Sequence, residues 1–414
     1  MTRRNFRMSG CAAMTLLFST ALMGAAKPVA AQQMPIGPGC PALYILGVQG
    51  TGQSSPTASL TADTGVIGAL LGPVVAAAPT LVQRSYVPYE AGFGGAVPGG
   101  GADPYATSVA SAVDGLVAAA SQAVQTCPAT MLAAVGYSQG AQAVAEFARS
   151  VGSGSGPVAP EQIAAIALYS NPTRAPGASV IPGRPGQSVP DPAPGSTGIE
   201  VAGVQLAGAS SDGGGIADDD AGYGALTGRV ADICVNGDLA CSAPDNAALL
   251  RAGAELAAQA DLRDPITALG SIQSLLASVL GDTWTALVLN DFHVQVADVD
   301  YSPTRTLAQR LIDAADPRTA GPSPDDVSAA GKRWGEITSA VMQNPVGVLP
   351  KMAGQLSSAW GQLIADNSDL MNPATLIRFA DTVARHNGYA STGQLSSGIA
   401  WLIALAHDLA GSRP

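Results

Sequence analysis

The residues best placed to do chemistry form a short motif, Gly136-Tyr137-Ser138-Gln139-Gly140. An apolar run at 131–135 precedes the motif, and a helical pattern at 141–150 follows it. In this context of strand, turn and helix, G-x-S-x-G is typical of a nucleophile elbow, where glycines flank the serine because the tight turn excludes side chains. The dipole and free amides at the start of the following helix favour a developing negative charge. The motif therefore predicts that Ser138 is a nucleophile.

A nucleophilic serine needs a base, and the base needs a carboxylate that orients it. In α/β-hydrolases these groups follow in the chain order serine, acid, histidine. Asp238 follows Ser138 in a turn that Cys234 and Cys241 flank. A disulfide across that turn would fix the aspartate, which suits an acid that holds an imidazole in one tautomer; the alternative is a simple turn residue. The chain offers three histidines as the base, His293, His386 and His407.

The cysteines indicate an oxidising compartment. Cys11 lies in the N-terminal segment discussed below, which leaves an even number, Cys40, Cys127, Cys234 and Cys241. Cys234 and Cys241 are close in sequence and flank the turn former Asn236-Gly237-Asp238, so we pair them, which leaves Cys40 to pair with Cys127. A metal site is the alternative, but C-x-x-C is missing and histidines are few, so we expect none.

At this point the chain resembles a known family, the serine esterases of the cutinase group. The resemblance covers about 38–242 and rests on four blocks in order: Cys40-Pro41, Gly50-Thr51, Cys127-Pro128 before the serine motif, and Cys234-x-x-Gly237-Asp238-x-x-Cys241. It implies an α/β-hydrolase core with a central, mostly parallel sheet, with Ser138 as nucleophile and Asp238 as triad acid. It also implies an oxyanion hole formed by Thr51 and the backbone amide of Gln139, the same two disulfides, and no cofactor.

The histidine is assigned from the same resemblance. His386 matches the family's His-x-x-Tyr pattern in His386-Asn387-Gly388-Tyr389 and precedes the last helix. His293 is the alternative, because it lies nearer to Asp238 in sequence and also precedes a helix. We predict His386, which makes residues 243–385 an insertion between acid and base. A comparable helical insertion is seen in mycobacteriophage lysin esterases, which resemble cutinases and cleave mycolyl esters.

The elements that must position these residues alternate between short apolar strands and helices. We expect the strands and the two best-defined helices at 42–48, 80–87, 105–125, 131–135, 141–150, 163–168 and 230–235. This alternation predicts βαβ units and a mostly parallel sheet, so we assign 32–242 to the α/β-hydrolase core. The run Asp218-Asp219-Asp220 suggests either a calcium site or, as we expect, a solvated acidic loop.

Residues 243–385 differ, because they show amphipathic helical periodicity throughout and predict a cap or lid. The helices are expected at 245–260, 265–280, 305–315, 324–342, 348–365 and 374–385. We expect Trp284, Trp334 and Trp360 in a helix–helix core; the alternative is an apolar wall for a long acyl chain. Residues 386–414 would return the chain to the core with the histidine and a last helix at 398–409.

The first 31 residues are typical of a secretory signal, with a charged start, an apolar run at 8–26 and the small residues Val29-Ala30-Ala31 before the expected cleavage. Arg3-Arg4 followed by Phe6 resembles a twin-arginine signal, and an ordinary Sec signal is the alternative. We find no other apolar stretch of membrane-spanning length and expect no stable transmembrane anchor. Without residues 1–31 the chain has 16 basic against 31 acidic residues, which argues against nucleic acid and anionic membranes as partners.

Together these residues predict a secreted or cell-wall-associated serine carboxylic-ester hydrolase, acting as a monomer on lipid or polyester esters through an acyl-enzyme. Only 12% of residues are charged, about half of the usual quarter, which leaves room for an exposed apolar site and favours long acyl chains. The Ala-, Gly- and Pro-rich composition suggests a high-GC actinobacterium, so the finer hypothesis is a cell-envelope mycolyl ester hydrolase. The alternatives are a short-chain or acetylxylan-type esterase, or a non-catalytic envelope-binding protein on a hydrolase fold.

Overall fold

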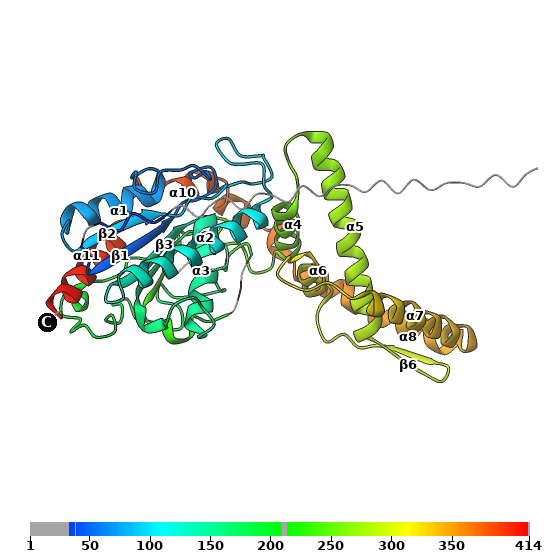
Figure 1. Cartoon of the computed structure of the whole chain (residues 1–414). Helices are drawn as coiled ribbons and strands as arrows, with labels where there is room; N and C mark the ends of the chain where they lie inside the picture. The colour runs from blue at the N-terminus through cyan, green and yellow to red at the C-terminus, as the bar shows by residue number, and fades with distance from the viewer. Residues whose placement is uncertain (1–32, 38, 209–212, 218, 220, 413–414) are drawn as a thin grey trace, which may run out of the picture. The chain divides into compact units, whose positions relative to one another are not determined.

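Five parallel strands form the central sheet, as the alternation of strands and helices predicts (Figure 1). In chain order the strands are β1 (Leu43–Val48), β2 (Val82–Tyr86), β3 (Met131–Tyr137), β4 (Ile163–Tyr169) and β5 (Val230–Ile233). They lie side by side in the order β2-β1-β3-β4-β5. Almost every strand residue is buried, which is the pattern of a parallel sheet with both faces covered by helices.

Helices cover both faces of the sheet. Successive residues of a strand point to opposite faces, so each strand contributes side chains to two apolar cores. Leu43 and Ile45 of β1 belong to the core that contains α1 (Gly65–Ala77) and α11 (Ser396–Gly411). Tyr44 and Leu46 belong to the other core, with α2 (Tyr105–Thr126) and α3 (Gln139–Gly152). The chain is thus an α/β fold in which the C-terminal helix packs beside α1, the first helix after β1.

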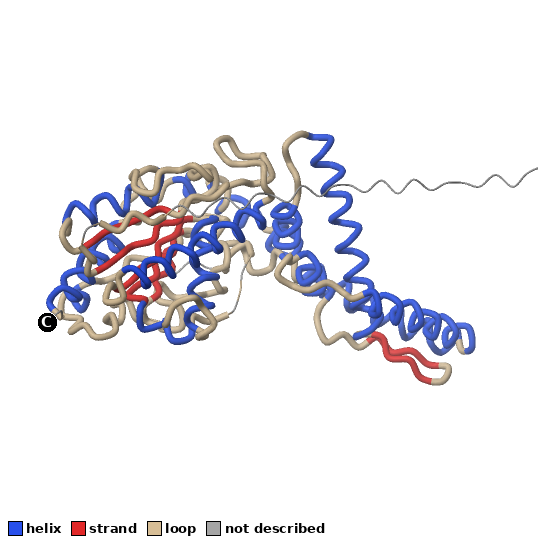
Figure 2. Tube along the Cα trace, in the orientation of Figure 1, coloured by secondary structure: helices blue, strands red, loops and turns tan. Residues whose placement is uncertain are grey.

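The segment between β5 and α11 is mostly helical (Figure 2). Its helices are α4 (Ala248–Gln259), α5 (Pro265–Asn290), α6 (Leu307–Ala315), α7 (Pro324–Gln343), α8 (Pro345–Ala365), α9 (Pro373–Arg378) and α10 (Thr382–Asn387). Several begin at a side chain that caps the first turn, with proline directly after it at Asp264, Ser323 and Asn344. The helices pack around apolar clusters of their own, such as the one that contains Val288, Ile337 and Val348.

A short antiparallel hairpin interrupts these helices, which the helical periodicity did not predict. It consists of β6 (Phe292–Gln295) and β7 (Asp298–Tyr301). Ala297 in its turn has φ +57°, a conformation for which hairpins usually use glycine or asparagine. The hairpin was therefore not recognisable from its turn residues.

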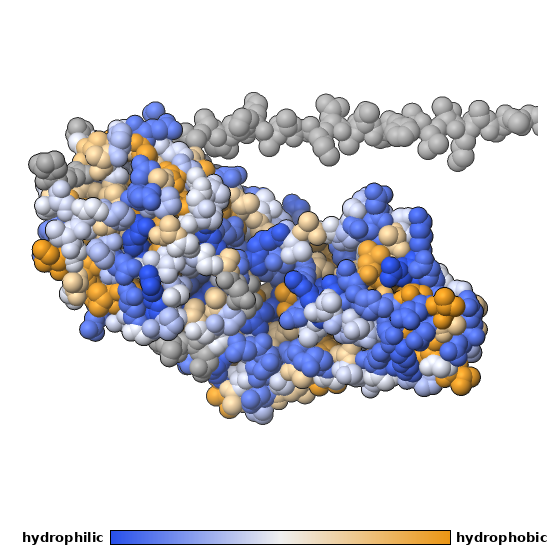
Figure 3. All heavy atoms as spheres, turned by 90° about the horizontal axis from the view of Figure 1, so that it is seen from below, coloured by the Kyte–Doolittle hydropathy of each residue, from blue (hydrophilic) through white to orange (hydrophobic). Residues whose placement is uncertain are grey.

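The three tryptophans of this segment are not core residues, contrary to the expectation. The side chains of Trp284 and Trp334 are 45% and 39% exposed and contact each other edge to face, with ring centroids 4.7 Å apart, while Trp360 is 61% exposed. In addition, α5 is long and apolar enough to cross a membrane by length and composition alone, so the expectation of no further apolar stretch of that length was wrong. Only 22% of its apolar stretch is buried, and a single helix of this kind is weak evidence for a membrane span. Figure 3, a view from below, shows apolar patches among hydrophilic ones on that face.

Two disulfides join the cysteines as paired in the sequence analysis. Cys40–Cys127 links the segment before β1 to the end of α2, and Cys234–Cys241 closes the turn after β5. The computed structural model describes residues 33–37, 39–208, 213–217, 219 and 221–412. The expected signal at 1–31, Asp218 and Asp220 lie outside the described residues.

Candidate active site

The site lies where three neighbouring strands end. Ser138 follows β3, Ser170 follows β4, and the turn that contains Asp238 follows β5. The backbone N–H of Ser138 donates to the carbonyl of Tyr169 (2.8 Å), and that of Ser170 donates to the carbonyl of Ile233 (3.0 Å). Because the strands are parallel and in register, these bonds continue the ladder past the strand ends. The three segments are therefore aligned at one edge of the sheet.

The turn at Ser138 has the geometry of a nucleophile elbow. Ser138 has φ +54°, which is uncommon for a residue with a side chain. A Cβ atom on Gly136 would lie 2.3 Å from the carbonyl oxygen of Gly140, and one on Gly140 would lie 2.3 Å from the carbonyl oxygens of Val48 and Gln49. Both flanking glycines are thus required by close backbone packing. At Gly140 this close contact is between the first turn of α3 and the end of β1.

Of the three histidines, all of which are described, His386 lies beside Ser138. Its Nε2 is 2.9 Å from Ser138 Oγ, and its Nδ1 is 2.9 Å from Asp238 Oδ1. His293 is exposed on β6 and His407 is exposed on α11, and neither lines the cavity that contains Ser138. The structure therefore brings Ser138, His386 and Asp238 into one hydrogen-bonded series.

Helix α10 carries His386 and is fastened directly to the turn that contains Asp238. The guanidinium of Arg385 donates to the carbonyl of Asn236 (2.7 Å), and the backbone N–H of Leu239 donates to Thr382 Oγ1 (2.8 Å). On the other side, the hydroxyl of Tyr137 donates to the backbone carbonyl of His386 (2.6 Å). These contacts fix the imidazole relative to Asp238 although the two residues are far apart in sequence.

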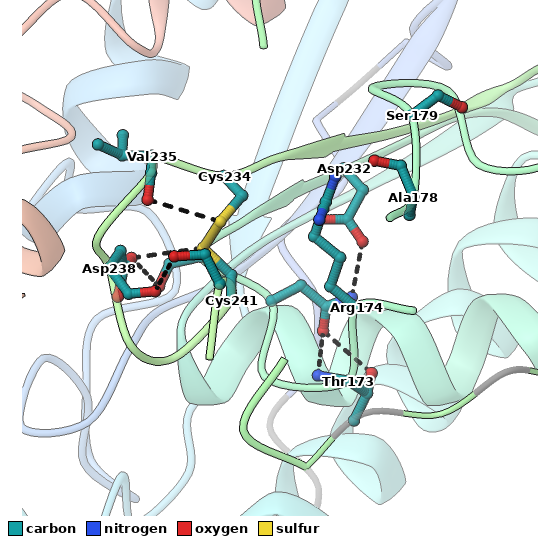
Figure 4. Close-up of polar contacts among 12 residues, drawn as sticks. Thr173, Arg174, Ala178, Ser179, Asp232, Cys234, Val235, Asp238 and Cys241 are labelled. Carbon is teal, nitrogen blue, oxygen red and sulfur yellow. Dashed lines mark hydrogen bonds and ion pairs between the residues drawn. A yellow bond between two sulfur atoms is a disulfide. The ribbon is translucent and has the colours of Figure 1, made fainter. Parts of the chain in front are cut away.

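The Asp238 carboxylate is fully buried and well supplied with donors. Oδ1 accepts from the backbone N–H of Ala240 (3.1 Å), and Oδ2 accepts from Tyr389 Oη (2.9 Å) and Ser170 Oγ (2.6 Å). Burial, reinforced by the charge of Asp238, raises the pKa of Tyr389 well above its usual value, so its hydroxyl stays protonated and can donate. Figure 4 shows Asp238 beside the Cys234–Cys241 disulfide that closes its turn.

Ser170 is the site residue that the sequence analysis missed. Besides Asp238, its hydroxyl contacts His386 Nδ1 at 2.9 Å. No motif surrounds Ser170, and the one available signal was its position directly after the buried strand 163–169, next to the strand that leads to Ser138. That signal becomes visible only when the strand order is known.

The two expected oxyanion-hole residues come from the elbow itself and from the loop after β1. Gln139 is the first residue of α3, where backbone N–H groups have no acceptor within the helix. Its side chain is occupied elsewhere, because Nε2 donates to the Gly92 carbonyl (2.9 Å) and Oε1 accepts from Tyr89 Oη (3.3 Å). Thr51, on the loop after β1, lines the same cavity as Ser138.

Ser138 and His386 open into a cavity of about 640 Å³, a size typical of small-molecule sites. Most of its wall is apolar and comes from two parts of the chain. The core contributes Phe93, Val97, Ala106 and Val109, and helix α4 contributes Ala254 and Ala258.

The cavity also has charged residues in its wall. Glu146 lies on α3 two turns after Ser138, and Arg318, between α6 and α7, forms ion pairs with Glu255 on α4 (3.6 Å) and with Asp219 (3.9 Å). Burial raises the pKa of Glu146. Among the described residues, no group of three or more His, Cys, Asp or Glu side chains is arranged to hold a metal ion.

Parts of the chain are similar to known proteins. A protein described as a carboxylesterase Culp6 homolog, from Corynebacterium glutamicum, is 33% identical over 128 residues, which cover 29% of this chain and 38% of that protein. The chain thus matches well under half of the length of this curated relative.

Among solved structures, the catalytic core domain of acetyl xylan esterase from Trichoderma reesei is 20% identical, with 57% of this chain and 99% of that chain covered and a TM-score of 0.36. Lysin B from Mycobacteriophage D29 is 16% identical, with 71% and 99% covered and a TM-score of 0.36. The family model described as Cutinase matches residues 39–251, more than half of the chain and the whole stretch from the first disulfide cysteine to the turn that holds Asp238. The chain belongs to the cutinase family.

Proposed function

We propose that this protein is a serine carboxylic-ester hydrolase that acts through Ser138, His386 and Asp238. The observation that carries the proposal is the series of two hydrogen bonds, each 2.9 Å long, from Ser138 Oγ through the imidazole to Asp238. Nucleophile, base and orienting acid are recognised by this geometry on many folds. The apolar cavity in front of Ser138 gives an ester a place to bind.

The reaction proceeds in two halves. Ser138 Oγ attacks the ester carbonyl carbon while His386 Nε2 takes the hydroxyl proton, and Asp238 stabilises the imidazolium that results. The backbone amide of Gln139 and a group on Thr51 stabilise the oxyanion. Collapse of the tetrahedral intermediate breaks the bond to the alcohol, which leaves with the proton from His386. Water then attacks the acyl-enzyme, gives a proton to His386, and the carboxylic acid departs as Ser138 regains its hydrogen.

We propose that the substrate has an apolar acyl chain of medium length or longer. The cavity wall is more apolar than polar, and its alanine, valine and phenylalanine side chains match methylene groups. Along α3, the rise of 1.5 Å per residue places Glu146 about 12 Å from Ser138. An extended chain covers about 1.2 Å per bond, so about ten bonds separate the ester carbon from these charged residues.

The segment 243–385 acts in this proposal as a cap inserted between acid and base. Support comes from α4, whose Ala254 and Ala258 form part of the cavity wall, and from the backbone bond between Leu262 N–H and the Gly94 carbonyl (2.7 Å). The protein is exported, an assignment supported by the two disulfides. A cell-envelope mycolyl ester is the finer hypothesis for the substrate, because the wall suits a long alkyl chain better than an acetyl group.

Hydrolysis of p-nitrophenyl esters from acetate to palmitate tests the proposal. Ser138→Ala and His386→Ala are expected to abolish turnover, whereas His293→Ala, a matched change at an exposed histidine, keeps the wild-type rate. Highest kcat/KM on acetate would contradict the acyl-chain assignment and favour the acetylxylan-type alternative. Turnover that survives in Ser138→Ala would refute the mechanism itself.

A further inference from the structure

Ser170 lies between the acid and the base without contacting the cavity. It follows β4, the strand between the one that ends at Ser138 and the one that leads to Asp238. Its side chain is fully buried, its Oγ lies 2.6 Å from Asp238 Oδ2 and 2.9 Å from His386 Nδ1, and it is not among the residues that line the cavity. Ser170 therefore contacts two members of the series but has no route to the substrate.

The directions of these hydrogen bonds follow from the protons available. The Asp238 carboxylate can only accept, so the single proton of Ser170 Oγ is donated to Oδ2. The Oγ lone pairs then face His386 Nδ1, which must be the donor. Nδ1–H is consequently shared between Asp238 Oδ1 at 2.9 Å and Ser170 Oγ at 2.9 Å. This closed triangle favours the tautomer that carries its proton on Nδ1 and leaves Nε2 free to accept from Ser138.

The backbone at Ser170 indicates that its hydroxyl has a use. Ser170 has φ +55°, a conformation that suits glycine and strains a residue with a side chain. The conformation is held from both sides. The N–H of Ser170 donates to Ile233, and the side chain of the next residue, Asn171, donates to the buried carboxylate of Asp232 on β5 (2.9 Å). A strained serine, where glycine would fit without strain, points to a function for the side chain.

We propose that Ser170 is a positioning residue for the ester hydrolysis: it holds the His386 imidazole and the Asp238 carboxylate in one plane and one protonation pattern. The inference rests on the proposed function, since it concerns the same site. Ser170 acts on the base through the shared Nδ1–H and on the acid through Oδ2. It complements Tyr389, whose hydroxyl donates to the same Asp238 oxygen.

Two substitutions at Ser170 separate the hydroxyl from the backbone. Ser170→Gly removes the hydroxyl and relieves the strain at φ +55°, and Ser170→Ala removes the hydroxyl and keeps the Cβ atom. Both are expected to lower kcat by about tenfold to a hundredfold, the effect of a lost hydrogen bond to a charged partner, with KM unchanged. Ser85→Ala, which removes another fully buried hydroxyl, from β2, is the matched control and keeps the wild-type kcat.

A proton NMR measurement gives a readout that a purely structural role would not move. The downfield resonance of His386 Nδ1–H is expected to shift in both Ser170 variants and to stay in place in Ser85→Ala. The proposal is overturned if Ser170→Gly keeps the wild-type kcat, or if the resonance does not move. Ser138→Ala run in parallel keeps the two hypotheses apart: if it retains turnover the proposed function fails, whereas an inactive Ser138→Ala beside fully active Ser170 variants refutes only the role of Ser170.

Discussion

The two disulfides are expected to rank in one order for their effect on stability and in the reverse order for their effect on catalysis. Cys40–Cys127 closes a loop with a sequence separation of 87, and Cys234–Cys241 one with a separation of 7. The loop-entropy relation gives a stabilisation of about 4.6 kcal/mol for the long loop and about 2.5 kcal/mol for the short one at ~25 °C. Replacing the first pair by serine should therefore lower Tm more than replacing the second pair.

Catalysis should show the reverse order. The short loop contains Asp238, whose carboxylate must stay in contact with His386, and a displacement of about 1 Å at a catalytic group can cost about a hundredfold in rate. Cys234→Ser/Cys241→Ser is thus expected to lose up to about a hundredfold in kcat, whereas Cys40→Ser/Cys127→Ser, far from the site in the fold, keeps kcat near the wild-type value below its Tm.

Thermal unfolding followed by circular dichroism, with kcat on p-nitrophenyl decanoate measured well below both transitions, tests this crossed pattern. Equal kcat in the two double variants would refute the view that the short disulfide fixes the acid. A lower Tm for the variant that lacks the short disulfide would refute the loop-length reasoning.

Three further predictions concern the cavity, a buried carboxyl and the elbow. Ala258→Phe places a phenyl ring in the cavity from α4 and should lower kcat/KM for the p-nitrophenyl ester of decanoate but not for that of acetate. The control is Ala257→Phe, at the neighbouring residue, which does not line the cavity; it should leave the dependence of kcat/KM on acyl length unchanged. Because burial raises the pKa of Glu146, ionisation opposes folding, so Glu146→Gln should raise Tm at neutral pH, and this gain should vanish as the pH falls below the usual pKa of glutamate. An equal rise in the Tm of Glu146→Gln over wild type at neutral pH and below the usual pKa of glutamate would contradict the view that the ionised carboxylate opposes folding. Gly140→Ala forces a Cβ atom against two backbone carbonyls and should lower the free energy of unfolding, measured in urea, by about 1–3 kcal/mol or more. An unfolding midpoint equal to that of the wild type would show that the elbow can relax.

Sequence patterns were sufficient wherever one local rule determined the structure. The buried strands lie within a few residues of the expected ranges because each is a short apolar run bounded by turn residues. The nucleophile turn was recognisable because Gly136 and Gly140 are required by local backbone contacts. Capped and proline-started helices, such as the one that begins at Pro324, were recognisable for the same reason.

Other features depend on contacts that are remote in sequence. Helix α1 was not expected, since it contains Pro73 and three glycines and its first turn has no side-chain cap, so its stability comes from packing against the sheet and α11. Ser170 has no motif and acquires its neighbours only from the strand order. The position of His386 beside Asp238 came from resemblance to a family pattern, because no local physical rule links residues separated by a long helical segment.

A covalent label tests most directly whether Ser138 is the nucleophile and His386 its base. A p-nitrophenyl alkylphosphonate is expected to react once per molecule, with release of one equivalent of p-nitrophenol and a phosphonyl adduct on the peptide that contains Ser138, as read by mass spectrometry. The adduct should form much more slowly in His386→Ala and at the wild-type rate in His293→Ala. A protein that stays unlabelled, or an adduct on Ser170, would contradict the proposed mechanism.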